Sequence, residues 1–205
     1  IEEGRSNQTA LDLIEGFRID SGYAAAAFVT DERRAICYYE KPLILVTDEK
    51  LETIEEMLPI LEQVARDGRP LVIVADNIVD QALAALIMNA VRGTMRIVAV
   101  KAPKYGEERK SILKDLAVSV GATYISRESG VQFNKVTLQD LGSAKSVEIG
   151  RNNSCFVGGK GDYGEIEKRI DMAKEQLRGT DSPQEGERIQ DRITKTKVNI
   201  NGRDF

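Results

Sequence analysis

The residues that could support a chemical reaction in this 205-residue chain are few, and their spacing assembles no recognisable catalytic set. The sequence contains no histidine, the commonest general base and metal ligand. A Ser–His–Asp or Cys–His nucleophilic arrangement is therefore excluded. The carboxylate pairs Glu55/Glu56 and Glu107/Glu108 lie at adjacent positions near expected helix N-termini, where they fit the helix dipole but do not converge. We predict no catalytic residues and no metal site.

One glycine-rich stretch, "GGKGDYG" at residues 158–164, is the strongest candidate for a phosphate-binding loop. It precedes an expected helix, but it lacks the GxxxxGK[ST] spacing that cradles phosphates. Dinucleotide folds place a glycine-rich turn directly after their first strand, and the turns after the strands expected at 42–48 and 70–75 contain no glycine. We interpret the stretch as a turn between a hairpin and a helix. A nucleotide- or small-molecule-binding α/β enzyme remains the alternative function.

The composition is that of an ordinary globular domain, with 41% apolar and 30% charged residues. The net charge of −4 gives no indication of nucleic-acid binding, and no apolar run approaches the roughly 20 residues of a membrane span. Cys37 and Cys155 lie in strand-like runs, which is more typical of reduced, buried thiols than of a disulfide. The chain begins at Ile1 without a signal peptide, which suggests an excised fragment or a processed product.

The middle of the chain alternates between apolar runs of strand length and amphipathic runs of helix length. Strands are expected at 35–40, 42–48, 70–75, 96–102 and 122–126, and helices at 51–67, 79–92 and 106–119. Pro59 belongs in a first helical turn, so the regular part of the first helix should begin near Met57. The alternation predicts an α/β fold with a mostly parallel sheet and flanking helices.

A smaller β-rich part is expected on either side of this core. Residues 11–20 read as two short strands around Gly16, and the alanine-rich run after Tyr23 is either a strand or a loop. A hairpin is expected at 143–150 and 154–159. Helices follow at 163–179 and from residue 187, and 196–205 show no persuasive structure.

The two helices at 51–67 and 79–92 carry more apolar residues than a surface helix needs, since one stripe is enough to cover a core. The first stripes are Met57, Ile60 and Val64, and Ala82, Leu86 and Ala90. The surplus stripes are Leu58, Leu61 and Ala65, and Leu83, Ile87 and Val91, with Met88 beside the second. Periodicity alone is compatible with burial on two sides, which is the usual outcome, or with an exposed apolar groove that binds a partner.

Five stretches resemble, in order, the apical domain of the GroEL family of group I chaperonins. They are "LDLIEGFRIDSGY", "EEMLPILEQVARDGRPLVIVAD", "ALAALIMNAVRG", "IVAVKAPKYGEERKSILKDLAVSVGATYIS" and "TLQDLGSAK". The resemblance covers all but the polar N-terminus and about ten C-terminal residues, and it favours the exposed groove. It implies an apical polypeptide-binding domain at 15–198, an intermediate-domain stub at 1–14, and a stub or tail at 199–205.

The resemblance also implies which residues bind non-native polypeptide and the mobile loop of a co-chaperonin. They are Tyr23, Ala25, Ala27 and Phe28 in an underlying segment, Leu58 and Leu61 on the first helix, and Leu83, Ile87 and Met88 on the second. Gly16 matches the family's N-terminal apical hinge. The family usually has a tyrosine where Ala27 stands, and its C-terminal pair of hinge glycines has no counterpart at 195–200.

Family members are homo-oligomeric rings that bind ATP and Mg²⁺ in a separate equatorial domain, so this chain alone is not expected to hydrolyse ATP or to hold a cofactor. The fragment is expected to be monomeric and to contact neither nucleic acid nor membrane. The implied location is the cytoplasm of a bacterium, or an organellar matrix or stroma. A third interpretation is a scaffold whose apolar stripes pack on one fixed partner.

Overall fold

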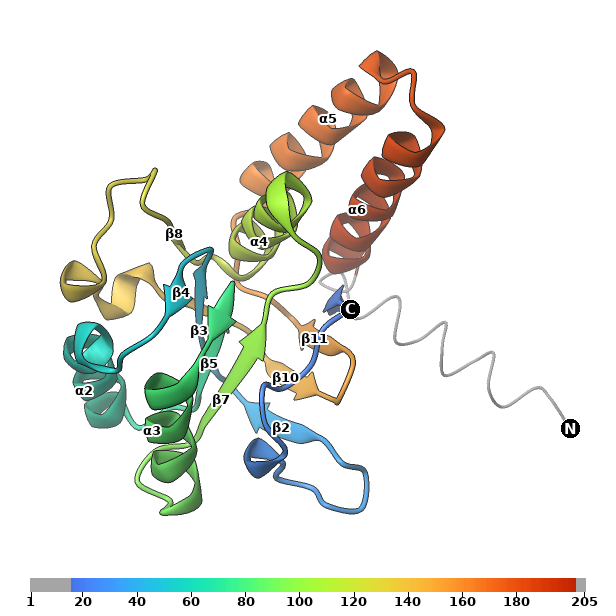
Figure 1. Cartoon of the computed structure of the whole chain (residues 1–205). Helices are drawn as coiled ribbons and strands as arrows, with labels where there is room; N and C mark the ends of the chain where they lie inside the picture. The colour runs from blue at the N-terminus through green and yellow to red at the C-terminus, as the bar shows by residue number, and fades with distance from the viewer. Residues whose placement is uncertain (1–15, 202–205) are drawn as a thin grey trace, which may run out of the picture.

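The computed structural model describes residues 16–201, apart from the side chains of residues 163 and 197–201 (Figure 1). The chain is mixed α/β. A parallel β-sheet with helices on both faces forms its centre, a smaller antiparallel sheet lies beside it, and a pair of long helices projects from one side. No described helix combines the length and the apolar character that a membrane crossing requires.

The central sheet has the strand order β7-β5-β3-β8, with all four strands parallel and β9 antiparallel on β3. Its strands are β3 (Leu43–Thr47), β5 (Leu71–Ala75), β7 (Ile97–Lys101), β8 (Tyr124–Ile125) and β9 (Gly142–Ser143). Every residue of β3 and β5 is buried. Continuous burial is expected of parallel strands covered on both faces, and the predicted sheet is confirmed.

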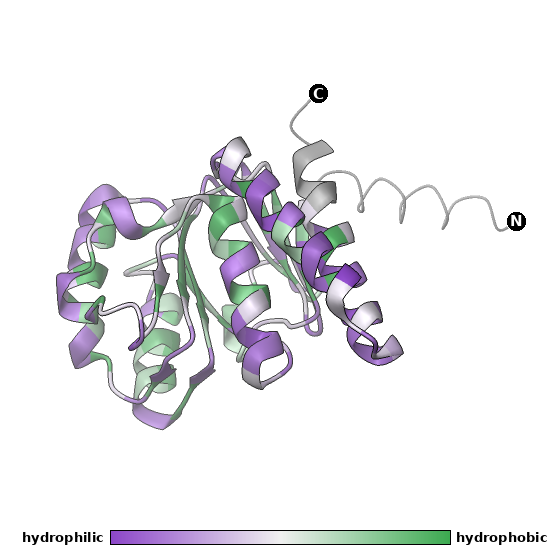
Figure 2. Cartoon of the chain, turned by 90° about the horizontal axis from the view of Figure 1, so that it is seen from above, coloured by the Kyte–Doolittle hydropathy of each residue, from purple (hydrophilic) through white to green (hydrophobic). Residues whose placement is uncertain are grey.

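The connections decide which helix covers which face. The path β3–α2–β5–α3–β7 moves stepwise toward one edge, and β7–α4–β8 then returns to the far side of β3. Because parallel crossovers are right-handed, α2 (Leu58–Asp67) and α3 (Asp80–Val91) share one face, and α4 (Gly106–Val120) covers the other. Figure 2 looks down on the molecule and shows the sheet between these two layers.

The smaller sheet is antiparallel, with the order β1-β11-β10-β2. Its strands are β1 (Gly16–Ile19), β2 (Cys37–Glu40), β10 (Ser146–Ile149) and β11 (Ser154–Val157). The hairpin of β10 and β11 confirms the prediction, with Val147 opposite Phe156. Both of these side chains are fully buried in the main core, so the two sheets share one hydrophobic interior.

The last two helices, α5 (Tyr163–Gly179) and α6 (Pro183–Asn201), pack along each other as an antiparallel hairpin. They enclose a small core of their own, formed by Ile166, Ile170, Ala173, Ile189 and Ile193. A buried carboxylate attaches this hairpin to α4. Asp115 accepts hydrogen bonds from Arg169 of α5 at 2.5 and 2.9 Å, and from Arg192 of α6 at 2.9 and 3.3 Å.

Several sequence predictions need correction. The alanine-rich run forms a 3₁₀ turn, η1 (Ala26–Phe28). The single helix expected at 51–67 is divided into three elements: β4 (Lys50–Leu51), the 3₁₀ turn η2 (Glu55–Met57) and α2. Strand β4 forms a short parallel pair with β6 (Asn77–Ile78). Helix α6 continues to Asn201, so it crosses the expected boundary at 198 and occupies residues for which no structure was predicted. The strand and domain stub expected before residue 16 lie outside the described residues.

Two further 3₁₀ turns, η3 (Phe133–Lys135) and η4 (Leu138–Asp140), connect β8 to β9. In the second turn, Thr137 and Asp140 form a capping box. Helix α2 packs on both turns, and α3 packs on β7 and η1. The helix pair therefore rests on the sheet, with one short turn segment at each outer side.

Candidate functional site

Helices α2 and α3 run parallel to each other, because each returns from the carboxyl end of one parallel strand to the amino end of the next. The stripes expected to face the core are confirmed: Met57, Ile60, Val64, Ala82 and Leu86 are fully buried, and Ala90 is partly buried. The outer side chains of the same two helices are therefore the ones available to a partner.

The flank of α2 that faces α3 carries Leu58, Leu61 and Ala65. Seen from its N-terminus, a right-handed helix advances clockwise by about 100° per residue. When α2 is viewed from its N-terminus with the sheet above it, a right-handed crossover places α3 on the right, which is the clockwise side. These three side chains lie clockwise of the buried face and therefore point toward α3. Leu58 is 44% exposed and Ala65 is exposed, whereas Leu61 is 5% exposed and belongs to the core.

The two flanks of α3 face different neighbours. By the same rotation, Ala85, Met88 and Arg92 lie on the side toward α2, and Leu83 and Ile87 lie on the side toward η1. Met88 is 48% exposed, while Leu83 and Ile87 are half-buried against the core. The sequence placed all of these apolar residues in one groove. The structure instead places Met88 on the flank of α3 toward α2, and Leu83 and Ile87 on the flank toward η1.

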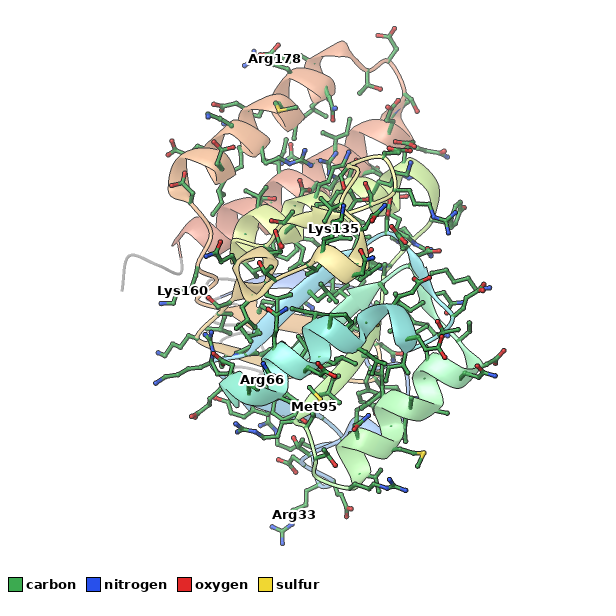
Figure 3. All side chains as sticks on the ribbon, turned by 90° about the vertical axis from the view of Figure 1, so that its left-hand side faces the viewer. Arg33, Arg66, Met95, Lys135, Lys160 and Arg178 are labelled. Carbon is green, nitrogen blue, oxygen red and sulfur yellow. The ribbon has the colours of Figure 1, made fainter. Side chains whose placement is uncertain are left out.

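Together the exposed and half-buried apolar residues of α2 and α3 form a set that we call the helix-pair surface. Its members are Leu58, Ala65, Leu83, Ala84, Ala85, Ile87, Met88 and Val91. Val91, at 69% exposure, is the most exposed apolar side chain of α3. Figure 3 faces this side of the molecule and shows α2 and α3 next to each other, with Arg66 and Met95 toward their C-terminal ends. These apolar side chains, exposed on one side of the sheet, make the helix-pair surface the candidate binding site.

The underlying segment contributes less than the resemblance implies. Phe28 is 2% exposed and Leu61 is 5% exposed, so these two members of the predicted set are buried in this structure, and their role in binding stays a prediction. Tyr23 and Ala25 are partly buried, and Ala27 is exposed at η1. The η1 segment is fixed to the sheet edge by a hydrogen bond from the Ala24 amide to the Ala99 carbonyl at 2.7 Å.

Gly16 begins β1 in a tightly packed position. A β-carbon there would lie 2.7 Å from the Phe156 carbonyl oxygen and 2.8 Å from Cys155 Sγ. The structure therefore requires glycine at this position because neighbouring atoms approach closely, whether or not the backbone also bends there. The hinge role that the resemblance implies stays a prediction.

Three exposed side chains of this site are absent from the residue set that the resemblance implies. Val91 belongs to the surplus stripe of its helix but not to that set. Arg66 lies in the last turn of α2 and Arg92 caps α3, so both stand at the C-terminal end of the helix-pair surface. The signal was present in the sequence as a basic residue at each helix end, a common position for a basic side chain near a helix C-terminus.

The interpretation of "GGKGDYG" as a turn is confirmed, because it connects β11 to α5. Its glycines pack against the end of α4. A β-carbon on Gly159 or Gly161 would overlap the backbone carbonyls of Ser119 and Val118. Packing against a helix end explains these glycines, and this close contact leaves no space for a phosphate beside them.

The sheet also has the crevice at which doubly wound folds usually bind ligands, where the connections from β3 and β8 diverge. A cavity of about 560 Å³ lies there, lined by Glu49, Glu56, Arg127 and residues 130–134. Burial raises the pKa of Glu49, and the charge of Arg127 opposes that shift. A mixed lining with two carboxylates and no glycine-rich loop is poorly suited to a nucleotide phosphate.

A second cavity, about 780 Å³, lies between α4 and the α5–α6 hairpin. Charged and polar side chains line most of it, among them Glu107, Glu108, Glu185 and Arg188. Glu108 forms an ion pair with Arg188 at 3.7 Å, so part of this charge is internally balanced. In the cavity beside α4, the Thr180 hydroxyl donates a hydrogen bond to the Glu185 carboxylate at 2.9 Å, at the exposed link between α5 and α6. No group of three or more carboxylate or thiol side chains within residues 16–201 could hold a metal ion.

The cysteines fit the prediction of a reduced thiol. Cys37 is free and fully buried in the main core, and burial raises its pKa to about 11, so the thiol is protonated at neutral pH. Cys155 on β11 is partly buried. A buried, protonated thiol is a poor nucleophile.

No family model matches this sequence. The assignment of a function therefore depends on the residues and geometry of the helix-pair surface.

Proposed function

We propose that this chain is the apical, polypeptide-binding domain of a GroEL-type chaperonin, and that it captures non-native polypeptides on the helix-pair surface. The observation that carries the proposal is the exposure of Leu58, Met88 and Val91 on two parallel helices. Each helix already buries a complete apolar stripe against the sheet, so these side chains are not needed to complete the core. Folded monomers seldom leave such residues together in water unless they serve binding.

The chemistry of the surface suits a partner of variable sequence. Aliphatic side chains and a flexible methionine make contacts that depend on apolar area and not on a hydrogen-bond code. Burial contributes about 25 cal/mol per Å², and association costs of several kcal/mol leave a weak single-site affinity. Weak sites become effective when a ring presents several of them to one chain, because the later contacts are intramolecular.

The remainder of the proposal follows the resemblance. The full-length protein would form a homo-oligomeric ring, bind ATP and Mg²⁺ in a separate domain, and act in a bacterial cytoplasm or an organellar matrix or stroma. The helix-pair surface would also receive the mobile loop of a co-chaperonin. A segment laid in a furrow between two helices is a common mode of peptide recognition. The chain described here would have no enzymatic activity of its own.

A titration of a fluorescently labelled amphipathic peptide, followed by anisotropy, tests the proposal. The variant Met88→Glu/Val91→Glu places two charges on the helix-pair surface at exposed positions, so the fold should be retained. We expect its affinity to fall at least about tenfold, the loss typical of central interface residues. Met172→Glu is the matched control, because Met172 is 55% exposed on α5, away from the surface.

Two results would contradict the proposal. One is equal binding by the parent and the Met88→Glu/Val91→Glu variant, with circular dichroism showing both folded. The other is a loss of affinity in the Met172→Glu control as large as in the double variant. A large thermal stabilisation by nucleotides would instead support the enzyme alternative.

A further inference from the structure

The helix-pair surface has a charge of opposite sign at each end. Because α2 and α3 run parallel, both N-termini lie at one end and both C-termini at the other. Glu55 precedes α2 and Asp80 begins α3, whereas Arg66 ends α2 and Arg92 caps α3. All four side chains belong to exposed residues. The apolar area therefore lies between an acidic end and a basic end.

Across the part of the chain that the structure describes, the fold provides no opposite side-chain charge for these four residues, although the partial charge of each helix end is opposite in sign to the side chain that stands there. Nearby charges are paired locally, as in Lys50–Glu52 at 2.9 Å and Arg69–Asp67 at 2.7 Å. Within the described residues, none of Glu55, Asp80, Arg66 and Arg92 belongs to an ion pair. They are thus available to charges on a ligand.

Two neighbouring residues add to this polarity. Glu62 is exposed on α2, one turn after Leu58 and one turn before Arg66. Its carboxylate extends the acidic end of the helix-pair surface toward the middle of α2. Arg96 follows α3 and donates a hydrogen bond to the Gly68 carbonyl at 2.7 Å, which holds its guanidinium at the basic end. Glu56 does not contribute, because it lines the crevice between β3 and β8.

The two ends are far enough apart to act separately. Helix α3 has 12 residues, and at 1.5 Å per residue it is about 18 Å long. This length is about twice the Debye length at physiological ionic strength, so a ligand charge at one end is largely screened from the other. The same length accommodates about five or six extended residues or about 12 helical residues.

We propose that the helix-pair surface preferentially binds segments whose apolar residues are bounded by a basic side chain at one end and an acidic side chain at the other. This inference rests on the proposed function and specifies its substrate class. The apolar residues supply contact area, and the flanking charges add attraction at both ends only when their signs differ. A segment with the same sign at both ends meets a repulsive end. Either chain direction satisfies the pattern, because a bound segment can be reversed.

Three labelled peptides with one common apolar centre test the proposal, with lysine and glutamate, two lysines, or two glutamates at the ends. At low salt we expect the mixed peptide to bind about three- to tenfold more tightly than either of the others, the range of a few exposed charge contacts. The difference should shrink at 0.5 M salt, because exposed charges are screened.

The variant Arg66→Glu/Arg92→Glu makes both ends acidic, and we expect its preference to change to the peptide with two lysines. Arg33→Glu/Arg151→Glu is the control: it changes the net charge by the same amount at two exposed arginines outside α2 and α3, and it should keep the parent's preference.

Each outcome decides the inference. Measurable but equal binding of the three peptides would overturn the charge preference and leave the apolar surface as the proposed site. Binding of none of them would contradict the proposed function as well. A change of preference in the Arg33→Glu/Arg151→Glu control as large as in the other variant would show that net charge, and not the polarity of this surface, selects the peptide.

Discussion

The two helix pairs of this molecule differ in how many of their apolar side chains they leave exposed to solvent. Helices α5 and α6 are antiparallel, are joined by residues 180–182, and pack closely on each other around their own small core. Helices α2 and α3 are parallel and rest on the sheet, each burying a stripe beneath it. The first pair encloses most of its apolar side chains, with Met172 as the exposed exception, and the second leaves Leu58, Met88 and Val91 in solvent.

The connections explain the difference. A short link lets α5 and α6 lie against each other along their length, as in any helical hairpin. The positions of α2 and α3 are set by β3, β5 and β7, because each helix belongs to a crossover between neighbouring strands. Helices placed in this way pack on the sheet, and their outer side chains are left exposed. The exposed methionines therefore have different surroundings: Met88 shares its helix with the exposed Ala84 and Val91, whereas Met172 is the only exposed large apolar residue among the described side chains of α5.

The largest effect is expected where the hairpin joins the body. Asp115→Ala leaves Arg169 and Arg192 with no carboxylate between them, and removing one partner of a buried ion pair costs about 3–5 kcal/mol. We expect urea denaturation to show a loss of this size in the free energy of unfolding. Probes placed in α4 and in the hairpin should report the same loss. Peptide affinity, measured where the variant remains folded, should be unchanged.

An exposed aspartate on the α5–α6 hairpin, Asp171, provides the control. Asp171→Ala removes a carboxylate from the outer face of α5 and should change stability by less than about 0.5 kcal/mol. If Asp115→Ala reduced peptide affinity in the folded state, the two helix pairs would be coupled, and the separation of their roles would be wrong.

A second effect separates structural from binding residues within α2. Leu61 is buried and Leu58 is exposed on the same flank. Leu61→Ala should cost about 2–5 kcal/mol in free energy of unfolding, as expected for deleting a buried leucine side chain. Leu58→Ala should cost less than about 1 kcal/mol and should weaken peptide binding. Equal losses of stability, measured by urea denaturation, would mean that both positions are core and that no binding furrow exists.

The smallest effect concerns the second attachment of the hairpin. Lys195 of α6 donates a hydrogen bond to Asp20 at 2.9 Å. Burial opposes ionisation of Asp20, but the hydrogen bond and charge of Lys195 outweigh it and lower the pKa of the carboxyl. A lowered folded-state pKa gives stability that is present above the usual carboxyl range and is lost as pH falls through the folded value.

Because the Asp20 side chain is more than half exposed, this contribution should be only about 0.5 kcal/mol. Denaturation of Asp20→Asn and the parent between pH 7 and pH 2 should give curves that converge at acid pH. If the difference in stability between the two proteins instead grew as the pH fell, the direction assigned to the Asp20 pKa shift would be wrong.

With no histidine in the chain, peptide binding should be nearly constant between pH 6 and 8.

The parts of the fold that repeat a local pattern could be predicted from the sequence. The buried strands β3 and β5 are continuous apolar runs, and Pro59 in the first turn of α2 and Gly68 after its last turn fix the ends of that helix. The parallel sheet then followed from the alternation of strands and helices. The surplus stripes also located the helix-pair surface, since Leu58 and Met88 are exposed.

What the sequence could not supply depends on contacts between distant segments. The burial of Phe28 and Leu61 is decided by the packing of η1 and α2, and periodicity does not report it. Assigning the α3 side chains to the flank toward α2 or to the flank toward η1 requires the handedness of the crossovers. The length of α6 was underestimated because its last residues lack an apolar stripe, although its earlier turns pack against α5 and β1.

The four methionines allow the central claim to be tested in a single spectrum. Met57 is buried under α2, Met88 is exposed on α3, Met95 is partly buried just beyond α3, and Met172 is exposed on α5. With ¹³C-labelled methionine methyl groups, addition of an amphipathic peptide should move the Met88 signal most and leave Met172 unchanged. A shift of Met172 without one of Met88 would place the peptide on the hairpin and contradict the account of the helix-pair surface.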